Sequence, residues 1–154
     1  MKKFEKTIGF TLIELIVTVF IISILVGVAV PLARNSIKRE KEVELREALR
    51  DIRTAIDKYK DASDRGFIPM KVDTEGYPET LQILVDGVDL NGQLNKKLKL
   101  LRRIPRDPMT NSTEWGLRAY QDDASSTSWG GQDVFDIYTK SQGTALDGTK
   151  YKEW

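Results

Sequence analysis

Hydrophobic residues are concentrated near the start of the chain, where residues 10–32 read FTLIELIVTVFIISILVGVAVPL. Glu14 is the only ionisable side chain in this run. A helix over residues 10–32 would extend about 34 Å at 1.5 Å per residue, which is enough to cross the hydrocarbon core of a bilayer. A soluble helix of this length needs a polar stripe, and the run has none. The pattern therefore predicts a transmembrane segment.

The following stretch, residues 34–65, has the periodicity of an amphipathic helix. Its apolar positions recur at steps of three and four: Leu45, Ala48, Leu49, Ile52, Ala55, Ile56 and Tyr59. The opposite face carries mixed charge, and its spacing predicts ion pairs of Glu42 with Arg46 and of Glu47 with Arg50. Because Pro31 is the only internal breaker, we expect one long helix, apolar in its first half and amphipathic in its second.

Shorter elements are predicted after Gly66, which is a plausible helix stop. Residues 79–85 indicate a short helix, and residues 94–104 a short helix or an irregular basic stretch. Alternating patterns predict strands at residues 114–120 and 134–139, with Phe135 and Ile137 on one face of the second strand. The fold class expected is α+β, a long N-terminal helix packed on a small C-terminal antiparallel sheet. We also expect the tail to dock through Tyr151 and Trp154, because an exposed tryptophan is disfavoured.

Composition removes several classes of function. The 154-residue chain contains neither cysteine nor histidine, which excludes disulfides, Ser–His and Cys–His nucleophilic pairs, and thiolate or imidazole metal sites. With 24 Lys+Arg against 23 Asp+Glu, the net charge is +1 and no overall field steers nucleic acid. Nothing completes an acid–base site beside Asp122 and Asp123. We therefore expect that the chain is not an enzyme and has no nucleic-acid partner.

The order of features at the N-terminus is the most informative part of the sequence. A short basic leader, residues 1–9, ends at Gly9 and precedes the apolar run. Three interpretations compete: a plain membrane anchor, a secretory signal cut near the small residues Gly27 and Ala29, and a leader cut between Gly9 and Phe10 with the apolar helix retained.

Glu14 distinguishes these interpretations. A carboxylate inside a bilayer costs about 2.5–3.5 kcal/mol on insertion scales, and neither an anchor nor a discarded signal benefits from that cost. A polymer subunit does benefit. Cleavage before Phe10 creates a free amine, which in an assembly can lie beside Glu14 of the neighbouring subunit and neutralise its charge. Processing and assembly are coupled in this interpretation.

Residues 9–14, GFTLIE, resemble the processing motif of type IV pilins and type II secretion pseudopilins. The resemblance implies cleavage between Gly9 and Phe10 by a membrane-bound aspartyl prepilin peptidase, followed by N-methylation of Phe10. It extends to the leader, the apolar helix and Pro31, which lies where the family often has a helix-melting proline. We also expect from the residues themselves that the turn between Gly27 and Pro31 is weak and acts as a hinge, because proline cannot donate a hydrogen bond to the carbonyl four residues earlier.

Within the family, the chain is most similar to the major pseudopilin of type II secretion systems. Residues 100–108, LLRRIPRDP, resemble a stretch that precedes the sheet of major pseudopilins, and Trp154 matches their terminal tryptophan. The resemblance implies a cleaved leader (residues 1–9), a transmembrane and filament-core helix (residues 10–33) and a periplasmic domain (residues 34–154). The alternative within the family is a type IV pilin that forms surface fibres for adhesion, motility or DNA uptake.

The partners implied are those of a periplasmic pseudopilus that drives protein export. They are further copies of the chain, minor pseudopilins, the prepilin peptidase, an inner-membrane platform with its cytoplasmic ATPase, and the outer-membrane secretin. The implied location is the bacterial inner membrane, spanned once, with the C-terminal domain in the periplasm. Lysines of the leader favour a cytoplasmic N-terminus, but basic residues also follow the apolar run, so the resemblance decides the orientation.

Two further groups of charged residues carry weaker hypotheses. Major pseudopilins often bind calcium after the last strand, and the candidates here are Asp122, Asp123, Asp133 and Asp147. Calcium prefers six to eight oxygen ligands, so we interpret these acids as solvated and expect no cofactor. The second group is a basic cluster: Lys96, Lys97, Lys99, Arg102, Arg103 and Arg106. We interpret it as a solvated face, with a contact between subunits as the second interpretation and acidic lipid or DNA as further ones.

Overall fold

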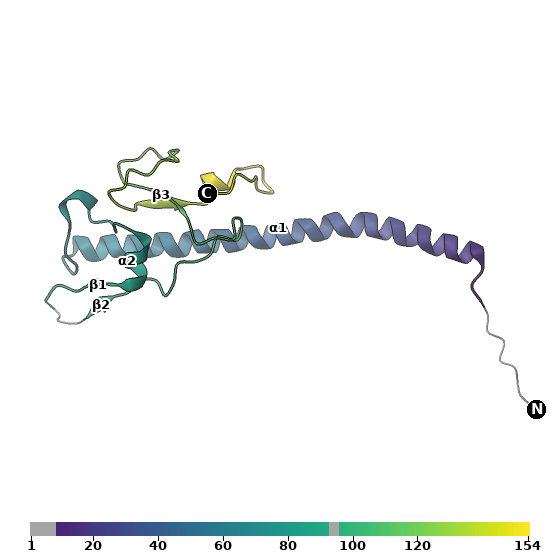
Figure 1. Cartoon of the computed structure of the whole chain (residues 1–154), viewed down its shortest axis with the longest axis horizontal. Coiled ribbons are helices and arrows are strands. Elements are labelled where there is room, and N and C mark those ends of the chain that lie inside the picture. The colour runs from purple at the N-terminus through teal and green to yellow at the C-terminus, as the bar shows by residue number, and fades with distance from the viewer. Residues whose placement is uncertain (1–8, 93–95) are drawn as a thin grey trace, which may run out of the picture. The chain divides into compact units, whose positions relative to one another are not determined.

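The computed structural model describes residues 9–92 and 96–154, so the lysines of the predicted leader lie outside the described residues. The chain divides into two compact units, residues 1–38 and 39–154, which we describe separately. The elements in chain order are α1 (Leu12–Asp64), η1 (Val72–Thr74), α2 (Leu81–Asp86), β1 (Val88–Asp89), β2 (Lys97–Leu98), β3 (Gly116–Arg118), β4 (Asp136–Tyr138) and η2 (Tyr151–Glu153). The α+β class predicted from the sequence is confirmed (Figure 1).

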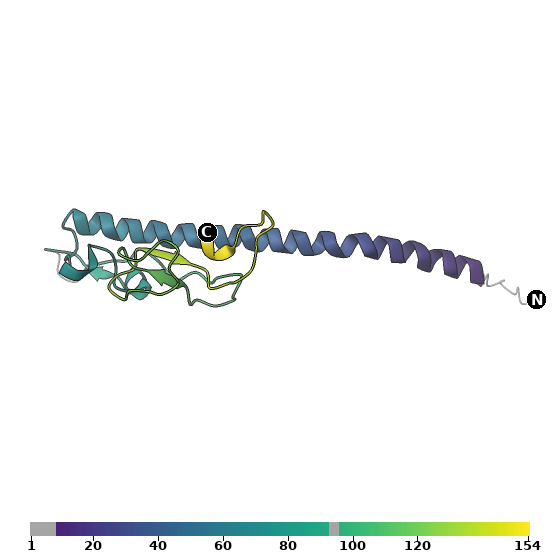
Figure 2. The ribbon, with the colours of Figure 1, turned by 90° about the horizontal axis from the view of Figure 1, so that it is seen from above.

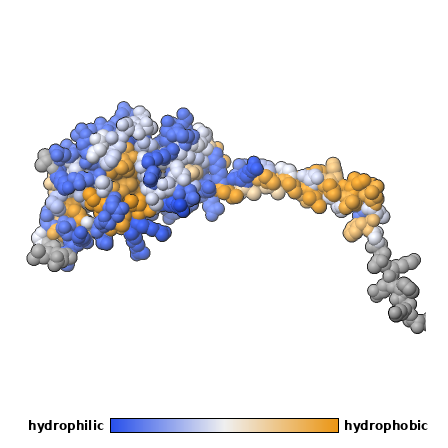
Figure 3. Space-filling view, in the orientation of Figure 1, coloured by the Kyte–Doolittle hydropathy of each residue, from blue (hydrophilic) through white to orange (hydrophobic). Residues whose placement is uncertain are grey.

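In the first unit, α1 exposes apolar side chains all round. The large hydrophobic residues from Phe10 to Leu32 are between 44% and 82% exposed. This helix is long and apolar enough to cross a membrane. Figure 3 shows hydrophobic side chains over most of the visible surface near its N-terminal end. Because such a surface is unstable in water, it needs either lipid or other polypeptide around it.

In the second unit, α1 supplies one wall of the core. Every apolar position in the predicted face is buried, and Leu45, Ile52 and Ile56 are completely buried. These side chains pack against residues from the rest of the unit, including Ile68, Leu84 and Ile137. The periodicity of three and four residues in the sequence therefore identified the core face of the helix correctly.

The C-terminal end of α1 is closed by a Schellman motif. The amide of Gly66 donates to the Ser63 carbonyl at 2.9 Å, and the amide of Phe67 donates to the Ala62 carbonyl at 2.9 Å. Gly66 has a φ angle of +72°, a left-handed conformation that glycine adopts without strain. The predicted stop is confirmed.

The first antiparallel pair lies next to α2. Strand β1 pairs with β2 in the register Val88↔Leu98 and Asp89↔Lys97. The amides of Leu100 and Leu101 both donate to the Leu84 carbonyl in α2. Among the described residues of the 94–104 stretch, the helix alternative is therefore wrong, because Leu98 and Leu100 pack against the core with the two-residue period of extended chain.

The second antiparallel pair, β3 with β4, has the register Gly116↔Tyr138, Leu117↔Ile137 and Arg118↔Asp136. The Tyr138 ring lies over Gly116 so closely that a Cβ atom there would clash with it. The Arg118 guanidinium lies over the same ring, 4.3 Å from its centroid. The two strands are shorter than the predicted segments but lie within them. The described residues thus form two separate two-stranded pairs, and the pair β3–β4 corresponds to the two strands expected from the sequence.

Phe135 and Ile137, which were predicted to share one face of the second strand, differ in burial. Ile137 is completely buried, whereas Phe135 is 42% exposed and contacts the rings of Tyr77 and Tyr120. Phe135 lies just before β4, and the residue before it, Val134, is the one that packs into the core and is completely buried.

A buried aspartate joins the turn before β3 to the end of β4. Asp107 is completely buried, and its carboxylate accepts hydrogen bonds from the amide of Met109 and the hydroxyls of Thr110 and Thr139. Because the carboxylate is fully hydrogen-bonded, its burial is tolerated. The turn predicted for this stretch is therefore a structural anchor.

Candidate processing and assembly site

The bond between Gly9 and Phe10 lies outside the helix. Both residues are exposed and non-helical, and α1 begins at Leu12. Phe10 is 82% exposed, so the Gly9–Phe10 bond lies on an accessible, non-helical segment. Hydrolysis of this bond would leave the helix intact.

Thr11 caps the helix. Its Oγ1 atom accepts a hydrogen bond from the Glu14 amide at 3.3 Å, and its carbonyl accepts one from the Leu15 amide at 3.1 Å. Thr-Leu-Ile-Glu is the sequence of a capping box, in which threonine precedes the first helical residue and glutamate follows three positions later. Sequence reasoning used only the charge of Glu14 and missed the cap by Thr11, although the spacing of Thr11 and Glu14 was sufficient to find it.

Glu14 lies in the first turn of α1. The helix dipole favours a negative charge at this end, which offsets part of the cost of placing a carboxylate in an apolar segment. Within residues 9–92 and 96–154, no cation lies within 4 Å of this carboxylate. The described part of a single chain therefore leaves Glu14 without a counter-ion.

Gly27 and Pro31 lie inside α1, which is continuous through both residues. A Cβ atom on Gly27 would meet nothing within 4 Å outside its own turns of helix. Glycine at position 27 is thus not required by any packing contact within the described chain. Loosening between these residues during assembly stays a prediction.

In the second unit, Glu42 anchors the C-terminal tail. Its Oε1 atom accepts hydrogen bonds from the amide of Leu146 at 2.8 Å and from the hydroxyl of Tyr151 at 2.9 Å. Burial, followed by the interaction with Glu42, raises the pKa of Tyr151 to about 12. The predicted pair of Glu42 with Arg46 is wrong, because the Glu42 side chain faces the tail.

Arg46 also contacts the tail. Its guanidinium lies 4.1 Å from the centroid of the Trp154 ring and 3.6 Å from the Asp147 carboxylate. The Tyr151 and Trp154 rings meet edge to face at 5.2 Å. Docking of the tail through its two aromatic residues is thereby confirmed. The predicted pair of Glu47 with Arg50 does not form within 4 Å in the described chain.

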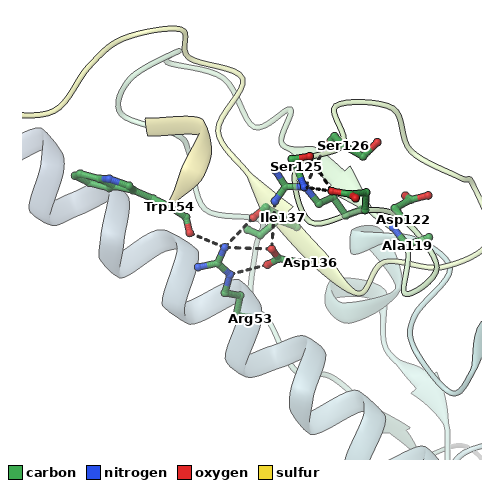
Figure 4. A network of polar contacts seen from close by, with 10 residues as sticks. Arg53, Ala119, Asp122, Ser125, Ser126, Asp136, Ile137 and Trp154 are labelled. Atoms are coloured by element: carbon green, nitrogen blue, oxygen red, sulfur yellow. Dashed lines mark hydrogen bonds and ion pairs between the residues drawn. The ribbon is translucent and has the colours of Figure 1, made fainter. Parts of the chain in front are cut away.

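Arg53 connects helix, sheet and tail (Figure 4). Its guanidinium donates to the Asp136 carboxylate, with 2.7 Å between Nε and Oδ1, and to the carbonyl oxygens of Ile137 and Trp154 at 3.1 and 2.8 Å. Asp136 also pairs with Arg118 at 3.4 Å. The planar guanidinium makes these contacts at the same time, which a lysine cannot do. Nothing in the spacing of Arg53 in the sequence pointed to this role.

The four calcium candidates have separate structural roles. Asp122 accepts hydrogen bonds from the amides of Ala119 and Gly130 at 2.7 and 3.0 Å. Hydrogen bonds from the amide and hydroxyl of Ser125 lower the pKa of Asp123, and those from Thr149 lower the pKa of Asp147.

The interpretation of these acids as solvated is wrong for Asp133. It is 1% exposed, and its Oδ1 atom accepts a hydrogen bond from the Tyr120 amide, while Oδ2 has no partner in the described structure. Burial raises the pKa of Asp133. Among the described residues, no group of three or more acidic side chains is placed to hold a metal ion. Since calcium requires several converging oxygens, this arrangement does not fit a calcium shell.

Comparison with known proteins identifies the N-terminal segment. Residues 6–30 match the prokaryotic N-terminal methylation motif, which is the type IV pilin-like signal. The match covers the Gly9–Phe10 bond, Thr11, Glu14 and Gly27. No curated protein and no solved structure matches the chain.

Proposed function

We propose that this chain, which carries the N-terminal methylation motif at residues 6–30, is the structural subunit of a periplasmic pseudopilus in a type II secretion system. The single observation that carries the proposal is the joint position of the Gly9–Phe10 bond and Glu14 at the start of an exposed apolar helix. The motif implies processing by a prepilin peptidase and polymerisation as a pilin-type protein.

The proposed sequence of events begins in the inner membrane. The peptidase hydrolyses the Gly9–Phe10 bond and the new amine of Phe10 is methylated. The amine of one subunit then lies beside Glu14 of its neighbour and supplies a counter-ion, which no described residue of the single chain provides. In the low dielectric of the filament core, this attraction offsets the burial of both charges and fixes the axial register.

The exposed apolar helix supports the same proposal. Lipid covers this surface before assembly, and the helices of other subunits cover it afterwards. The second unit remains in the periplasm and needs no metal, because Glu42, Arg46 and Arg53 hold the tail. The chain itself performs no catalysis, and the cytoplasmic ATPase acting through the membrane platform supplies the work.

The second candidate is a type IV pilin of surface fibres, which the same motif also supports. Residues 100–108 and the absence of cysteine favour the pseudopilin, since many pilins close a C-terminal loop with a disulfide. Shearing of cells separates the two candidates. A pseudopilin yields no long surface fibres at native expression, whereas a pilin does.

The proposal is tested by the mature N-terminus and by Glu14→Ala. We expect a mature chain that starts at methylated Phe10, and a Glu14→Ala chain that inserts into the membrane but does not polymerise. The matched control is Glu153→Ala, an exposed acid of the second unit, which should assemble normally. A mature start at Met1 or Val30, or normal polymers from Glu14→Ala, would overturn the proposal.

A further inference from the structure

Three aromatic rings form an exposed cluster on the second unit, which we call the aromatic patch: Tyr77, Tyr120 and Phe135. Tyr77 stacks on Tyr120 with 5.8 Å between ring centroids, and Phe135 meets both rings edge to face at 5.2 and 5.4 Å. Tyr120 is 55% exposed and Phe135 is 42% exposed. Rings that pack together yet remain open to solvent are typical of contact surfaces.

The surroundings of the aromatic patch carry charges of both signs. Burial is the main cause of the raised pKa of Tyr77; the charge of Lys60 opposes the rise, and the charges of Asp57 and Asp64 add to it, so one cation and two carboxylates lie within electrostatic reach of the ring. Glu79, which pairs with Lys71, and Glu75 lie on either side of Tyr77 in the sequence. Negative charge beside aromatic faces attracts cationic side chains, because the faces carry the negative part of the ring quadrupole.

Cations lie over aromatic faces in this chain, both outside the aromatic patch and at one of its rings. Arg46 lies over Trp154, Arg118 over Tyr138, and Lys60 lies 5.5 Å from the centroid of Tyr77. Within the described residues, no cation lies over Tyr120 or Phe135. One face of Tyr120 stacks on Tyr77, and the partial exposure of Tyr120 and Phe135 leaves the rest of these two rings accessible from outside the subunit.

The second surface is the basic cluster of residues 96–106. Its six lysine and arginine side chains are exposed, and no acidic residue occurs between positions 96 and 106. Within the described chain none of the six forms an ion pair within 4 Å. Arg102 and Arg103 line a groove of about 1100 Å³ opposite acidic residues of α1, but those acids do not pair with them either.

The strands next to the two surfaces lie on different flanks of the second unit. In Figure 1, β2, where the basic cluster begins, lies on one side of α1, and β3, which leads to Tyr120, lies on the other. Figure 2 shows both flanks on the same side of the helix when seen from above. Two complementary surfaces that do not overlap allow each subunit to bind one neighbour with each surface. Such heterologous contacts build open helical polymers.

We propose that the basic cluster of one copy docks on the aromatic patch of the next copy, with Arg102 and Arg103 over the exposed rings of Tyr120 and Phe135. This inference rests on the proposed function, because it requires a homopolymer. Arginine suits the contact, since its planar guanidinium stacks on a ring while its donors reach neighbouring carboxylates. An acidic lipid surface would engage the basic cluster but would leave the aromatic patch uncovered.

Site-directed crosslinking tests the contact, and the cysteine-free chain is suited to it. Full-length Arg103→Cys and Tyr120→Cys chains are expressed singly and together, and the assembled polymers are treated with a short bismaleimide. We expect crosslinked dimers only when both variants are present, and ladders of higher oligomers from the double variant. Phe67→Cys replaces Tyr120→Cys in the control, because Phe67 is also 55% exposed but lies outside the aromatic patch.

Charge reversal tests the contact independently of crosslinking. The variant Arg102→Glu/Arg103→Glu should lower the yield of polymer at least tenfold, while thermal unfolding stays unchanged because both side chains are exposed. Arg65→Glu is the matched control, since Arg65 is an exposed arginine that pairs only with Asp61 in the described chain. Its yield of polymer should equal that of the wild type.

The outcomes separate this inference from the proposed function. Normal polymers from the reversed variant without mixed crosslinks would overturn the docking contact alone. Crosslinking of Tyr120→Cys chains with one another in the absence of the second variant would indicate a symmetric contact and would also overturn it. If the reversed variant polymerises normally but binds acidic vesicles less tightly than the wild type, the basic cluster recognises lipid instead. A wild-type chain that is processed at Phe10 and never polymerises would overturn both proposals.

Discussion

The hydroxyl of Tyr151 donates a 2.9 Å hydrogen bond to the Glu42 carboxylate across a separation of 109 residues. The same carboxylate oxygen accepts the amide of Leu146 at 2.8 Å. The Glu42 side chain on α1 thus holds both ends of the segment 146–151. The tail has little regular structure of its own, so its position depends on these contacts.

Removal of the Tyr151 hydroxyl should loosen the tail. We expect Tyr151→Phe to lower the free energy of unfolding by about 1.5–3 kcal/mol, the usual range for a hydrogen bond to a charged group. Thermal unfolding of the full chain in mild detergent, followed by circular dichroism, measures the loss. Tyr120→Phe is the control, because the Tyr120 hydroxyl has no hydrogen-bond partner in the described structure, and it should unfold like the wild type.

The buried acid Asp133 should make stability depend on pH. Because burial raises its pKa, the folded chain binds this proton more tightly than the unfolded chain. The stabilisation of the folded chain by this proton is fully present below the ordinary carboxyl pKa, and it is lost as the pH rises through the raised pKa of Asp133. At neutral pH we therefore expect Asp133→Asn to be more stable than the wild type, by about 1 kcal/mol or more. Unfolding curves at pH 7 and pH 4 should show the advantage shrinking at the lower pH.

Asp123 provides a comparison of opposite sign. Hydrogen bonds from Ser125 lower the pKa of Asp123. The ionised carboxylate therefore stabilises the folded chain above the ordinary carboxyl pKa, and this stabilisation is lost as the pH falls through the lowered pKa. Asp123→Asn should therefore be no more stable than the wild type at pH 7. If Asp133→Asn and Asp123→Asn change the free energy of unfolding in the same direction at pH 7, the opposite pKa shifts assigned to the two carboxyl groups are wrong.

Arg53→Lys should uncouple the tail from the sheet. A lysine keeps the charge but cannot reach Asp136 and both carbonyl oxygens together. We expect a loss of about 1–3 kcal/mol in the free energy of unfolding. We also expect more rapid hydrogen exchange at the amides of η2, measured by mass spectrometry. Arg50→Lys, an exposed neighbour on the same helix, should change neither quantity.

The helix should loosen at Gly27 when the subunit enters a filament. Pro31 cannot donate to the Gly27 carbonyl, so this turn is held by fewer hydrogen bonds than its neighbours. In a cryo-electron microscopy map of the filament, we expect non-helical backbone between these residues, and continuous helix in a Pro31→Ala filament. A continuous wild-type helix at this position would contradict the prediction.

The features set by local periodicity were predictable from the sequence. The buried face of α1 follows from the three- and four-residue spacing, and the helix stop follows from Gly66. The site at the N-terminus was predictable for the same reason, because Gly9, Phe10 and Glu14 are close in the chain. Even the Thr11 cap, which we missed, carries a local signal.

Contacts between distant residues could not be predicted in the same way. The spacing of Glu42 and Arg46 suggests a pair on one helix, but the docked tail offers Glu42 the buried hydroxyl of Tyr151 and places the Trp154 ring beside Arg46. Phe135 has the spacing from Ile137 that residues on one strand face should have, but its contacts with the rings of Tyr77 and Tyr120 outside the core could not be inferred from that spacing. These outcomes depend on which segments meet in three dimensions.

The close approach of the Tyr138 ring to Gly116 has an evolutionary consequence. In the register pair Gly116↔Tyr138, the ring occupies the space where another residue would place its side chain. A larger residue at position 116 would displace the ring from beneath Arg118 and break its hydrogen bond to the Thr127 carbonyl. Descendants of this sequence should therefore change the two positions together or keep both.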